Sequence, residues 1–446
     1  MLVLRIKKTI AYLKRNGLKN TVLTVMERIE QRRNVKYSYA FVGEEEIEKQ
    51  KKKVFNYMPK ISIVVPCYET KPVFLEDMIL SVEDQTYSNY ELIIIDASKT
   101  DYCNRLCNSL KNEFDNIIYK RLSDNKGIAE NTNEGIKMAS GEYIALLDHD
   151  DVITEDALYS VVEYLNKCKN EEERPALIYS DEDKTNEYME KYFEGTSKHK
   201  MNIDMLLSNN YVCHLSVYKA EVLKELLLRK EYDGAQDHDL VLRLVAYLKE
   251  RYNEMWTEKI HYIPKVLYHW RCFSGSSSVN TASKDYAYEN GLKAVKDFLD
   301  KQGIDANVHH MKHKGFFRVE YNDVFEQRKD VCAVGGPIFS MDKCVGGAMD
   351  RKGNILYSGL RKGYTGYMNK ASIQQDVDVL DIRNIVIRRS YENLFKRETG
   401  YSYPLNASVI AKMSDSEAIK KSIAFCNKAR SRNINFLYDP EMALDK

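Results

Sequence analysis

Three short apolar runs, each ending at a polar turn, constrain the fold of this chain more than any other feature. Between them lie segments in which apolar residues recur at helical spacing. Buried strands that alternate with helices predict a parallel sheet with crossover helices. Ligands of such sheets bind outside the carboxyl ends of the strands, which is where Asp96 and Asp148 lie. The three runs are KISIVVPCY at 60–68, YELIIID at 90–96 and GEYIALLD at 141–148.

The chain has 446 residues, too many for one compact core, so two or three domains are expected. Residues 1–58 show helical spacing and end in the polar run EEEIEKQKKK, which predicts a helical segment and a linker. Residues 59–304 contain the alternating strands and helices and form the expected α/β domain. Residues 305–446 have short strand-like runs and a last helix near 416–430, which predicts a smaller α+β domain.

Composition excludes several classes of protein. The net charge of +1 argues against a nucleic-acid-binding protein, which normally has a basic excess. The nine cysteines form no CxxC pair, so neither a zinc site nor a disulfide framework is indicated, and free thiols suit a reducing cytosol. No stretch approaches the roughly 20 apolar residues of a membrane span, and basic residues interrupt the apolar N-terminus. A cytoplasmic protein without a signal peptide is therefore expected.

The run LLDHDD places Asp148, Asp150 and Asp151 on the turn that leaves a buried strand. Carboxylates this close repel one another unless a cation lies among them. Mg²⁺ and Mn²⁺ take oxygen ligands, typically one or two carboxylates together with substrate phosphates. The turn is therefore a candidate metal and phosphate site. The alternative is a solvated acidic loop that caps the following helix.

The order of motifs resembles a known family. The chain from about 59 to 300 is similar to the family 2 glycosyltransferases of GT-A fold, most of all to the branch that builds bacterial surface polysaccharides. The resemblance implies a nucleotide diphosphate sugar donor, Mn²⁺ or Mg²⁺, inversion at the anomeric carbon, and a glycan acceptor that is commonly lipid-linked. It rests on KISIVVPCYE, IIID, SDNKGIAENTNEGI, ASGEYIALLDHDD, YSDEDK, AQDHDL and VLYHWR.

The resemblance assigns donor contacts to the first two strand ends. Pro66, Tyr68 and Glu69 match the turn that contacts the nucleotide base, and Asp96 matches an acid that hydrogen-bonds the base or ribose. The family usually has two acids before a serine here, whereas this chain has Ala97 after Asp96, which leaves the identity of the nucleotide open. Asp96 alternatively caps the next helix.

Further donor and metal contacts follow along the chain. Lys126 and Asn131 match the loop over the donor, although Lys126 is equally well explained as an exposed lysine. Asp148 and Asp150 match the D-x-D motif, in which the first acid lies mainly on the ribose side and the second binds the metal. Asp151 is expected to cap a helix or to support the turn.

The resemblance also supplies a base. Asp237 in GAQDHDL matches the acid that takes the proton of the acceptor hydroxyl, and Asp239 matches a residue that supports the loop. A position at a helix start favours the ionised form of Asp237, and burial opposes it. His269 in YHWR falls where many members place a further metal ligand, but a lone histidine beside a tryptophan is more often a packing residue.

Other motifs have weaker readings. The triplet Asp181–Asp183 recurs in this branch on the acceptor side, or is an acidic turn. HHMKH near His309 lacks the spacing of a metal site and is read as surface. Residues 305–446 resemble a degraded second glycosyltransferase half and are expected to bind acceptor or partner. Two alternatives remain, a non-catalytic scaffold of a glycan-assembly complex and a sugar-phosphate nucleotidyltransferase.

The N-terminus carries a candidate membrane-contact surface. Ile6, Ile10 and Leu13 recur at helical spacing among basic residues, and no acid precedes Glu27. A basic amphipathic helix of this kind binds an anionic membrane surface peripherally. Packing against the rest of the protein would use the same residues.

Overall fold

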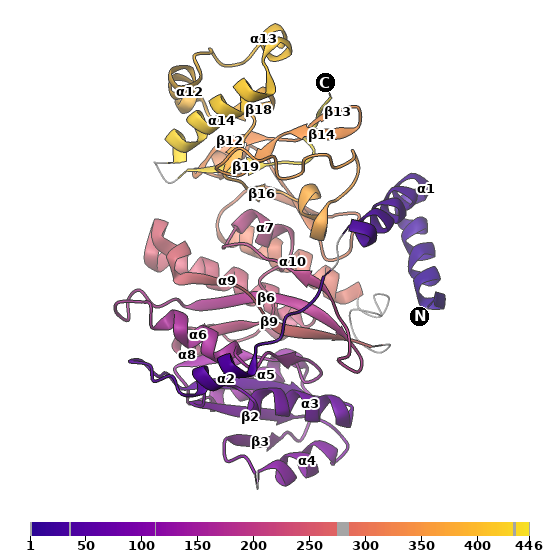
Figure 1. Cartoon of the computed structure of the whole chain (residues 1–446), viewed down its shortest axis with the longest axis vertical. Coiled ribbons are helices and arrows are strands. Elements are labelled where there is room, and N and C mark those ends of the chain that lie inside the picture. Colours follow the sequence, from indigo (N-terminus) through magenta and orange to yellow (C-terminus); the bar gives the residue numbers. More distant parts are fainter. Residues whose placement is uncertain (1, 35–36, 112, 274–284, 431–433, 446) are drawn as a thin grey trace. The chain divides into compact units, whose positions relative to one another are not determined.

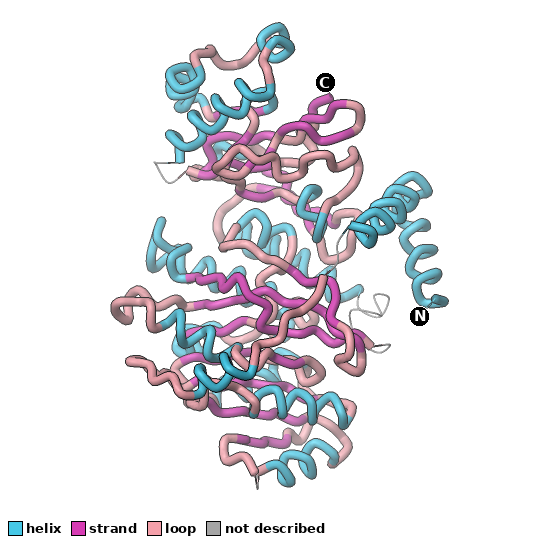
Figure 2. Tube along the Cα trace, in the orientation of Figure 1, coloured by secondary structure: helices cyan, strands magenta, loops and turns pink. Residues whose placement is uncertain are grey.

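The computed structural model describes residues 2–34, 37–111, 113–273, 285–430 and 434–445 (Figures 1 and 2). The chain forms two compact units. The larger consists of residues 37–201 and 210–298, and the smaller of residues 1–36, 202–209 and 299–446.

The larger unit is built on one mixed sheet of nine strands in the order β3-β2-β1-β4-β8-β6-β9-β5, with β7 paired to β6. Strands β3, β2, β1 and β4 run parallel, whereas β8 is antiparallel to β4. The strands are β1 (Ile61–Cys67), β2 (Tyr90–Asp96), β3 (Ile117–Arg121), β4 (Tyr143–Leu146), β5 (Val152–Ile153), β6 (Leu177–Asn186), β7 (Tyr192–Thr196), β8 (Ser216–Lys219) and β9 (Ile260–Cys272).

Helices connect the parallel strands, so the predicted alternation is present. Helix α3 follows β1, α4 follows β2 and α5 follows β3. The α-helices that lie in or begin in this unit are α2 (Glu44–Lys51), α3 (Pro72–Glu83), α4 (Tyr102–Leu110), α5 (Ile128–Met138), α6 (Ala157–Leu165), α8 (Ala220–Leu226), α9 (Gln236–Tyr252) and α10 (Asp285–Lys301).

The core forms where the sequence is richest in β-branched residues. Every residue of β2 is buried, as is every residue of β1 except Pro66, because both faces of these strands are covered. Helix α5 comes close to β1 and β2 at Gly135. A Cβ added at Gly135 would lie 2.5 Å from Val64 Cγ1, so a side chain there would push the helix off the sheet.

The smaller unit combines short sheets with helices, as an α+β domain does. Its larger sheet has the order β16-β19-β12-β18, and α14 packs with α12 and β17. Its strands are β10 (Ala306–His310), β11 (Phe317–Tyr321), β12 (Val331–Gly335), β13 (Ile338–Ser340), β14 (Lys343–Gly346), β15 (Ala348–Met349), β16 (Gln375–Asp376), β17 (Val379–Leu380), β18 (Ile385–Ile387), β19 (Asn435–Tyr438) and β20 (Leu444–Asp445). Its helices are α1 (Leu2–Asn34), α7 (Ile203–Ser208), α11 (Val324–Gln327), α12 (Glu392–Thr399), α13 (Ala407–Lys412) and α14 (Asp415–Arg430).

The two units do not follow the three consecutive segments expected from the sequence. Helix α1 belongs to the smaller unit, because the carboxylate of Glu27 accepts hydrogen bonds from the backbone N–H groups of Thr365 and Gly366. Helix α7 belongs there too, since Asp204 forms an ion pair with Arg328 at 2.5 Å. Of the N-terminal segment expected at 1–58, residues 1–36 are thus grouped with the smaller unit and residues 37–58 with the larger.

Helix α1 is bent at Gly17, whose φ of 75° is non-helical, and Figure 1 shows its two pieces. Of the N-terminal stripe, Ile10 and Leu13 are exposed, whereas the side chain of Ile6 lies outside the described residues. No described helix is both long enough and apolar enough to cross a membrane.

Candidate active site

The acidic turn lies between β4 and β5, and one of its three carboxylates holds the turn in place. Asp151 is buried, and it accepts a hydrogen bond of 2.6 Å from the hydroxyl of Tyr268 and one of 2.7 Å from the backbone N–H of Arg271. Both partners lie on β9. Asp148 and Asp150 keep side-chain exposures of 42% and 22% and are therefore accessible to a ligand.

The electrostatics of the turn favour a cation. Burial raises the pKa of Asp150 above its usual value, and the neighbouring Asp148 adds to the rise. Burial, Asp150 and Asp148 together raise the pKa of Asp151 well above its usual value. Among the described residues no group of three or more His, Cys, Asp or Glu side chains is arranged to hold a metal ion. Two carboxylates nevertheless fit an ion whose remaining ligands are diphosphate oxygens and water.

A histidine that the sequence analysis did not single out links this turn to β6. His214 Nε2 lies 3.5 Å from Asp148 Oδ2, and its Nδ1 lies 3.6 Å from Glu182 Oε2. The ring stacks on Tyr268 at 4.6 Å. Behind Glu182 lies the ammonium group of the buried Lys198, at 3.2 Å. Burial lowers the pKa of His214, but Cys213, Asp148 and Glu182 outweigh it and raise the pKa well above its usual value.

Asp237, the candidate base on α9, lies beside the same cluster. Asp237 is the second residue of that helix, and its Oδ2 accepts a hydrogen bond of 3.1 Å from Gln236 and lies 4.0 Å from Cys213 Sγ. Cys213 Sγ in turn lies 3.2 Å from His214 Nε2. Burial, with Asp148 adding to it, raises the pKa of Asp237 to about 6. The raised pKa is the direction expected of a buried carboxylate next to another acid.

Asp239, the competing acid, is committed to the scaffold. Its Oδ2 accepts hydrogen bonds of 3.0 Å from Arg229 Nε and 2.9 Å from Arg243 Nε. Arg229 Nη2 also donates to the other oxygen. Both carboxylate oxygens are thus occupied by guanidinium groups, so the geometry of Asp239 is that of a support for the start of α9.

The turns after β1 and β2 are tied together at the edge expected to contact the nucleotide. The backbone N–H of Glu69 donates to Ser98 Oγ at 2.8 Å, and the Glu69 carboxylate accepts from the backbone N–H of Lys99 at 2.7 Å. Tyr68 is 43% exposed at this edge, and Pro66 is half-buried at the end of β1.

Asp96 lies beneath these turns and is fully buried. Its Oδ1 accepts a hydrogen bond of 2.9 Å from the backbone N–H of Ser98, and its Oδ2 accepts one of 2.8 Å from the hydroxyl of Tyr119. It does not cap α4, whose N-cap position is Asp101. In this arrangement Asp96 positions Ser98, and a direct contact with a nucleotide would require the turn to move.

The loop before α5 is held by one buried amide side chain. Asn131 is buried, and its Oδ1 accepts from the backbone N–H of Lys126 at 3.3 Å, which leaves the Lys126 side chain exposed. Gly127 adopts a φ of 103°, and a Cβ there would lie 2.3 Å from Asp233 Oδ2. Asp233 also accepts from the backbone N–H of Ala129 in the first turn of α5. The close approach that Gly127 permits is thus to Asp233.

The segment that contains the acidic turn matches a known protein family. Residues 62–227 match the family model described as glycosyl transferase family 2. The chain contains a family 2 glycosyltransferase domain. The matched segment includes all of β1 except its first residue, the acidic turn and His214, and it ends before α9. The resemblance and the fold class predicted from the sequence, a GT-A mixed sheet with a smaller α+β part, are confirmed.

Two curated relatives of the matched domain are named for glycan biosynthesis or glycosyl transfer. The O-antigen biosynthesis protein RfbC of Myxococcus xanthus is 31% identical over 56% of this chain and 19% of its own length. The GalNAc(5)-diNAcBac-PP-undecaprenol beta-1,3-glucosyltransferase of Campylobacter jejuni is 27% identical over 51% of this chain and 70% of its own length. The chain spans a quarter or less of the length of the first curated relatives that it matches.

Among solved structures, residues 1–349 of S. aureus TarS in complex with UDP-GlcNAc are 18% identical. That match covers 54% of this chain and 66% of the other, with a TM-score of 0.42.

His269 lies apart from the acidic cluster of the glycosyltransferase domain. Neighbouring residues of a strand point to opposite faces, so His269 faces away from the side on which Tyr268 meets Asp151. Its Nδ1 lies 2.5 Å from Asp183 Oδ1, and Tyr39 and Tyr192 surround its ring. The predicted metal ligation by His269 therefore has no support in this geometry, and the alternative of a packing residue describes its surroundings.

The acidic triplet is also placed differently from the expected turn. Asp181–Asp183 continue β6, which pairs with β7 and β9. Alternation along the strand sends Glu182 to His214 and Lys198, whereas Asp183 faces His269. These buried acids remain in a strand because each has a cationic or hydrogen-bonding partner there.

Proposed function

We propose that this protein is an inverting glycosyltransferase that transfers a sugar from a nucleotide diphosphate sugar to a hydroxyl group of a glycan. The family 2 domain supports the reaction class. The proposed donor-binding residues are those named from the sequence, with Asp96 acting through the turn that it holds. They are Pro66, Tyr68, Glu69, Asp96, Lys126, Asn131 and Asp148.

One observation carries the proposal. Asp148 of the acidic turn and Asp237 of α9 lie near the same pair of neighbouring residues. His214 lies 3.5 Å from Asp148, and Cys213 lies 4.0 Å from Asp237. A single displacement needs a base near the acceptor and a site for the leaving diphosphate within one cleft. The cluster offers both.

In the proposed reaction the acceptor oxygen attacks the anomeric carbon while Asp237 takes its proton. The new bond from oxygen to carbon forms as the bond from carbon to the diphosphate oxygen breaks, and the nucleoside diphosphate leaves with that electron pair. Because the attack comes from the face opposite the leaving group, the configuration inverts. Asp148 and Asp150 would hold Mg²⁺ or Mn²⁺, which when bound screens the diphosphate charge.

A panel experiment tests the proposal. The full chain is incubated with nucleotide diphosphate sugars and Mn²⁺, and release of nucleoside diphosphate is measured with and without candidate glycan acceptors. Acceptor-stimulated release from one donor supports the proposal. Release of pyrophosphate from a nucleoside triphosphate and a sugar phosphate would instead indicate a nucleotidyltransferase. The absence of release from every donor favours the scaffold alternative.

The proposal also covers the acceptor and the cellular location of the reaction. The relatives named for O-antigen and for an undecaprenol-linked glycan support an acceptor of cell-surface polysaccharide biosynthesis carried on a lipid. We place the reaction in the cytoplasm at the inner face of the membrane, with α1 as the membrane contact and the remainder of the smaller unit as an acceptor- or partner-binding part. In the second piece of α1 the exposed apolar residues recur at helical spacing, which supports a peripheral contact. They are Leu18, Val22, Val25, Met26 and Ile29.

A further inference from the structure

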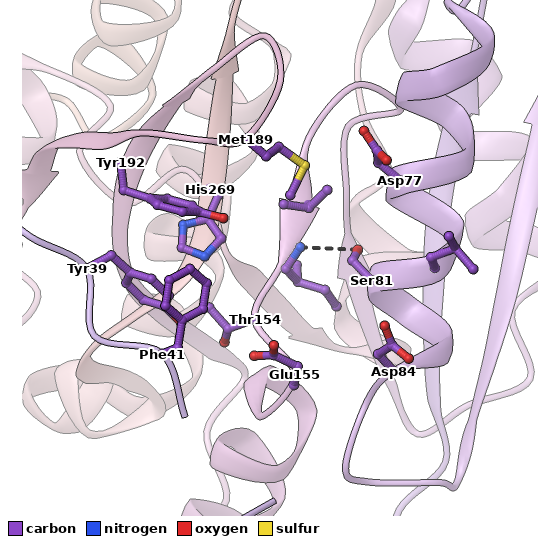
Figure 3. A pocket seen from close by; sticks show the side chains of 13 residues that line it. Tyr39, Phe41, Asp77, Ser81, Asp84, Thr154, Glu155, Met189, Tyr192 and His269 are labelled. Carbon is purple, nitrogen blue, oxygen red and sulfur yellow. Dashed lines mark hydrogen bonds between the residues drawn. The ribbon is translucent and has the colours of Figure 1, made fainter. Parts of the chain in front are cut away.

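A pocket of about 240 Å³ lies in the larger unit on the His269 side of β9. Figure 3 shows α3 on one side and an aromatic wall on the other, formed by Tyr39, Phe41, Tyr192 and His269. Its lining comes from the segment after α1, from α3 and the residue that follows it, and from β5 with the two residues that follow it. Met189 in the turn between β6 and β7, together with β7 and β9, completes it. The proposed chemistry of transfer uses none of these side chains.

The rings of the aromatic wall contact one another, and one of them is exposed to solvent. The ring of Tyr39 lies edge-on to His269 at 4.5 Å and to Phe41 at 4.9 Å, and it lies 5.2 Å from Tyr192. Phe41 is 64% exposed. Tyr39 and Tyr192 are half-buried, so Phe41 supplies most of the exposed aromatic area. Exposed aromatic area at a pocket marks a binding surface, because burying it against a ligand removes apolar area from water.

The wall is held in place by a buried carboxylate. Asp183 Oδ2 accepts a hydrogen bond of 2.7 Å from the hydroxyl of Tyr37, and Asp183 Oδ1 lies 2.5 Å from His269 Nδ1. Tyr37 fits closely against β7, where a Cβ at Gly195 would lie 2.2 Å from its ring. One acid therefore fixes both the segment that carries Tyr39 and the ring that Tyr39 contacts.

The opposite wall and the floor are acidic. Asp77 forms an ion pair of 3.0 Å with Arg271, whereas the carboxylates of Asp84 and Glu155 accept no hydrogen bond from the described residues. Burial, with Glu155 next in effect, raises the pKa of Tyr39, so its hydroxyl stays protonated among these acids.

These features select among ligand classes. Free carboxylates repel a diphosphate, which argues against a nucleotide sugar or an anionic lipid headgroup. The volume lies below the roughly 300–1,000 Å³ of pockets for drug-sized ligands, so it suits one ring. A sugar ring stacks its C–H face on aromatic side chains and donates its hydroxyl protons to carboxylates.

We propose that this pocket is a second carbohydrate site, which binds one neutral or amino sugar unit of the glycan acceptor away from the site of transfer. The assignment to the acceptor rests on the proposed function, whereas the preference for a sugar rests on the pocket itself. Such a site would hold a growing chain while its end enters the active site.

Saturation-transfer NMR on the full chain tests the site, with methyl β-glucoside, methyl β-galactoside and methyl N-acetyl-β-glucosaminide as probes. Choline chloride and a nucleoside diphosphate are the competing probes. At least one glycoside should bind, and Tyr192→Ala should weaken it by about tenfold or more, the loss of about 1.4 kcal/mol. Tyr192→Phe, which keeps the ring, should retain binding. Tyr188→Ala is the matched control, since Tyr188 lies between β6 and β7, is 74% exposed and does not line the pocket.

Glu155→Gln is a second variant in case Tyr192→Ala is misfolded, and it should weaken the same glycoside. Asp150→Asn should leave glycoside binding unchanged while it removes transfer, so failure of the proposed reaction and failure of this site are separable. Three results would overturn the inference. They are absence of binding by every glycoside at millimolar concentration, equal binding by wild type and both pocket variants, and a preference for choline or the nucleoside diphosphate over all sugars.

Discussion

Asp237 and Asp239 lie two residues apart in the first turn of α9, yet they have opposite surroundings. Asp239 is held by the guanidinium groups of Arg229 and Arg243, whereas Asp237 accepts from Gln236 and has a pKa raised to about 6. Residues two apart on a helix do not share a face, so one carboxylate can support the loop while the other faces the cluster around His214. The chemistry proposed here depends on this division.

Replacement of the proposed base should separate catalysis from donor binding. Asp237→Asn should lower kcat by about 10²–10⁴-fold, because a positioned proton acceptor contributes that much, and leave donor affinity nearly unchanged. Steady-state kinetics and calorimetry measure the two quantities. Glu250→Gln, at an exposed position of α9, is the control. Asp239→Asn should instead lower the melting temperature, and near-normal turnover of Asp237→Asn would exclude it as the base.

The pH dependence of kcat/KM should report the same residue. Asp237 accepts a proton only when ionised, and its pKa is raised to about 6. Activity should therefore fall as the pH drops through about 6, by roughly tenfold per pH unit below it. The rate profile of wild type between pH 4 and 8, set beside that of Asp237→Asn, measures this. An acid limb that persists unchanged in the variant would assign it to another group.

Metal dependence should follow the acidic turn. Asp150→Asn should abolish the part of the nucleoside diphosphate affinity that requires Mg²⁺ or Mn²⁺, since it removes one of two accessible carboxylates. Titration calorimetry with and without the metal gives the difference. His269→Ala serves as the comparison, because His269 faces Asp183 on the other side of β9, and its metal-dependent affinity should match wild type. Equal loss in both variants would restore His269 as a ligand.

Truncation after residue 304 should fail to give a stable protein. Helix α7 buries Ile203, Met205, Leu206 and Leu207, and it packs on β11 and β16, which the shortened chain lacks. Asp204 would also lose Arg328, and breaking a buried ion pair costs about 3–5 kcal/mol. Solubility and thermal unfolding of residues 1–304 and of the full chain give the comparison. A soluble, cooperatively folding 1–304 fragment would show that the smaller unit is dispensable for folding.

Membrane contact through α1 predicts a dependence on lipid charge. The full chain should co-sediment with vesicles that contain anionic lipid and much less with neutral ones. Val22→Glu with Ile29→Glu should reduce that binding, since both side chains are exposed on α1. Tyr188→Glu, in the larger unit, is the control. Sedimentation that is indifferent to lipid charge and to the double substitution would leave α1 as a structural brace.

The sequence predicted the parts of the fold that local patterns determine. The apolar runs at 61–67, 90–96 and 143–146 are the strands β1, β2 and β4, because continuous β-branched segments between polar turns have few other stable arrangements. Asp148 and Asp150 were found for the same reason, since they follow such a strand directly. The helix at 415–430 was likewise visible from its spacing.

Contacts between residues far apart in the sequence could not be predicted from local patterns. Asp181–Asp183 looked like a turn because three successive acids are rare in a buried strand. The partners that make the strand possible come from distant segments of the chain, and they include Lys198, His214, Tyr262 and His269. His214 went unnoticed since nothing local marks it, and its partners lie far away in sequence. The face that His269 occupies was equally hidden, because it depends on the register of β9 with β6.

The aromatic segment that carries Tyr39 and Phe41 lies outside the family match, which begins at residue 62. Two of the four aromatic-wall residues, Tyr39 and Phe41, thus lie in a different part of the sequence from the strands beside the acidic turn. On our proposal, mutations in residues 37–43 alter what the pocket accepts without changing a residue of the acidic turn or of α9. Exchange of this short stretch between relatives is accordingly a route by which acceptor preference could diverge in evolution, and by which it could be re-engineered.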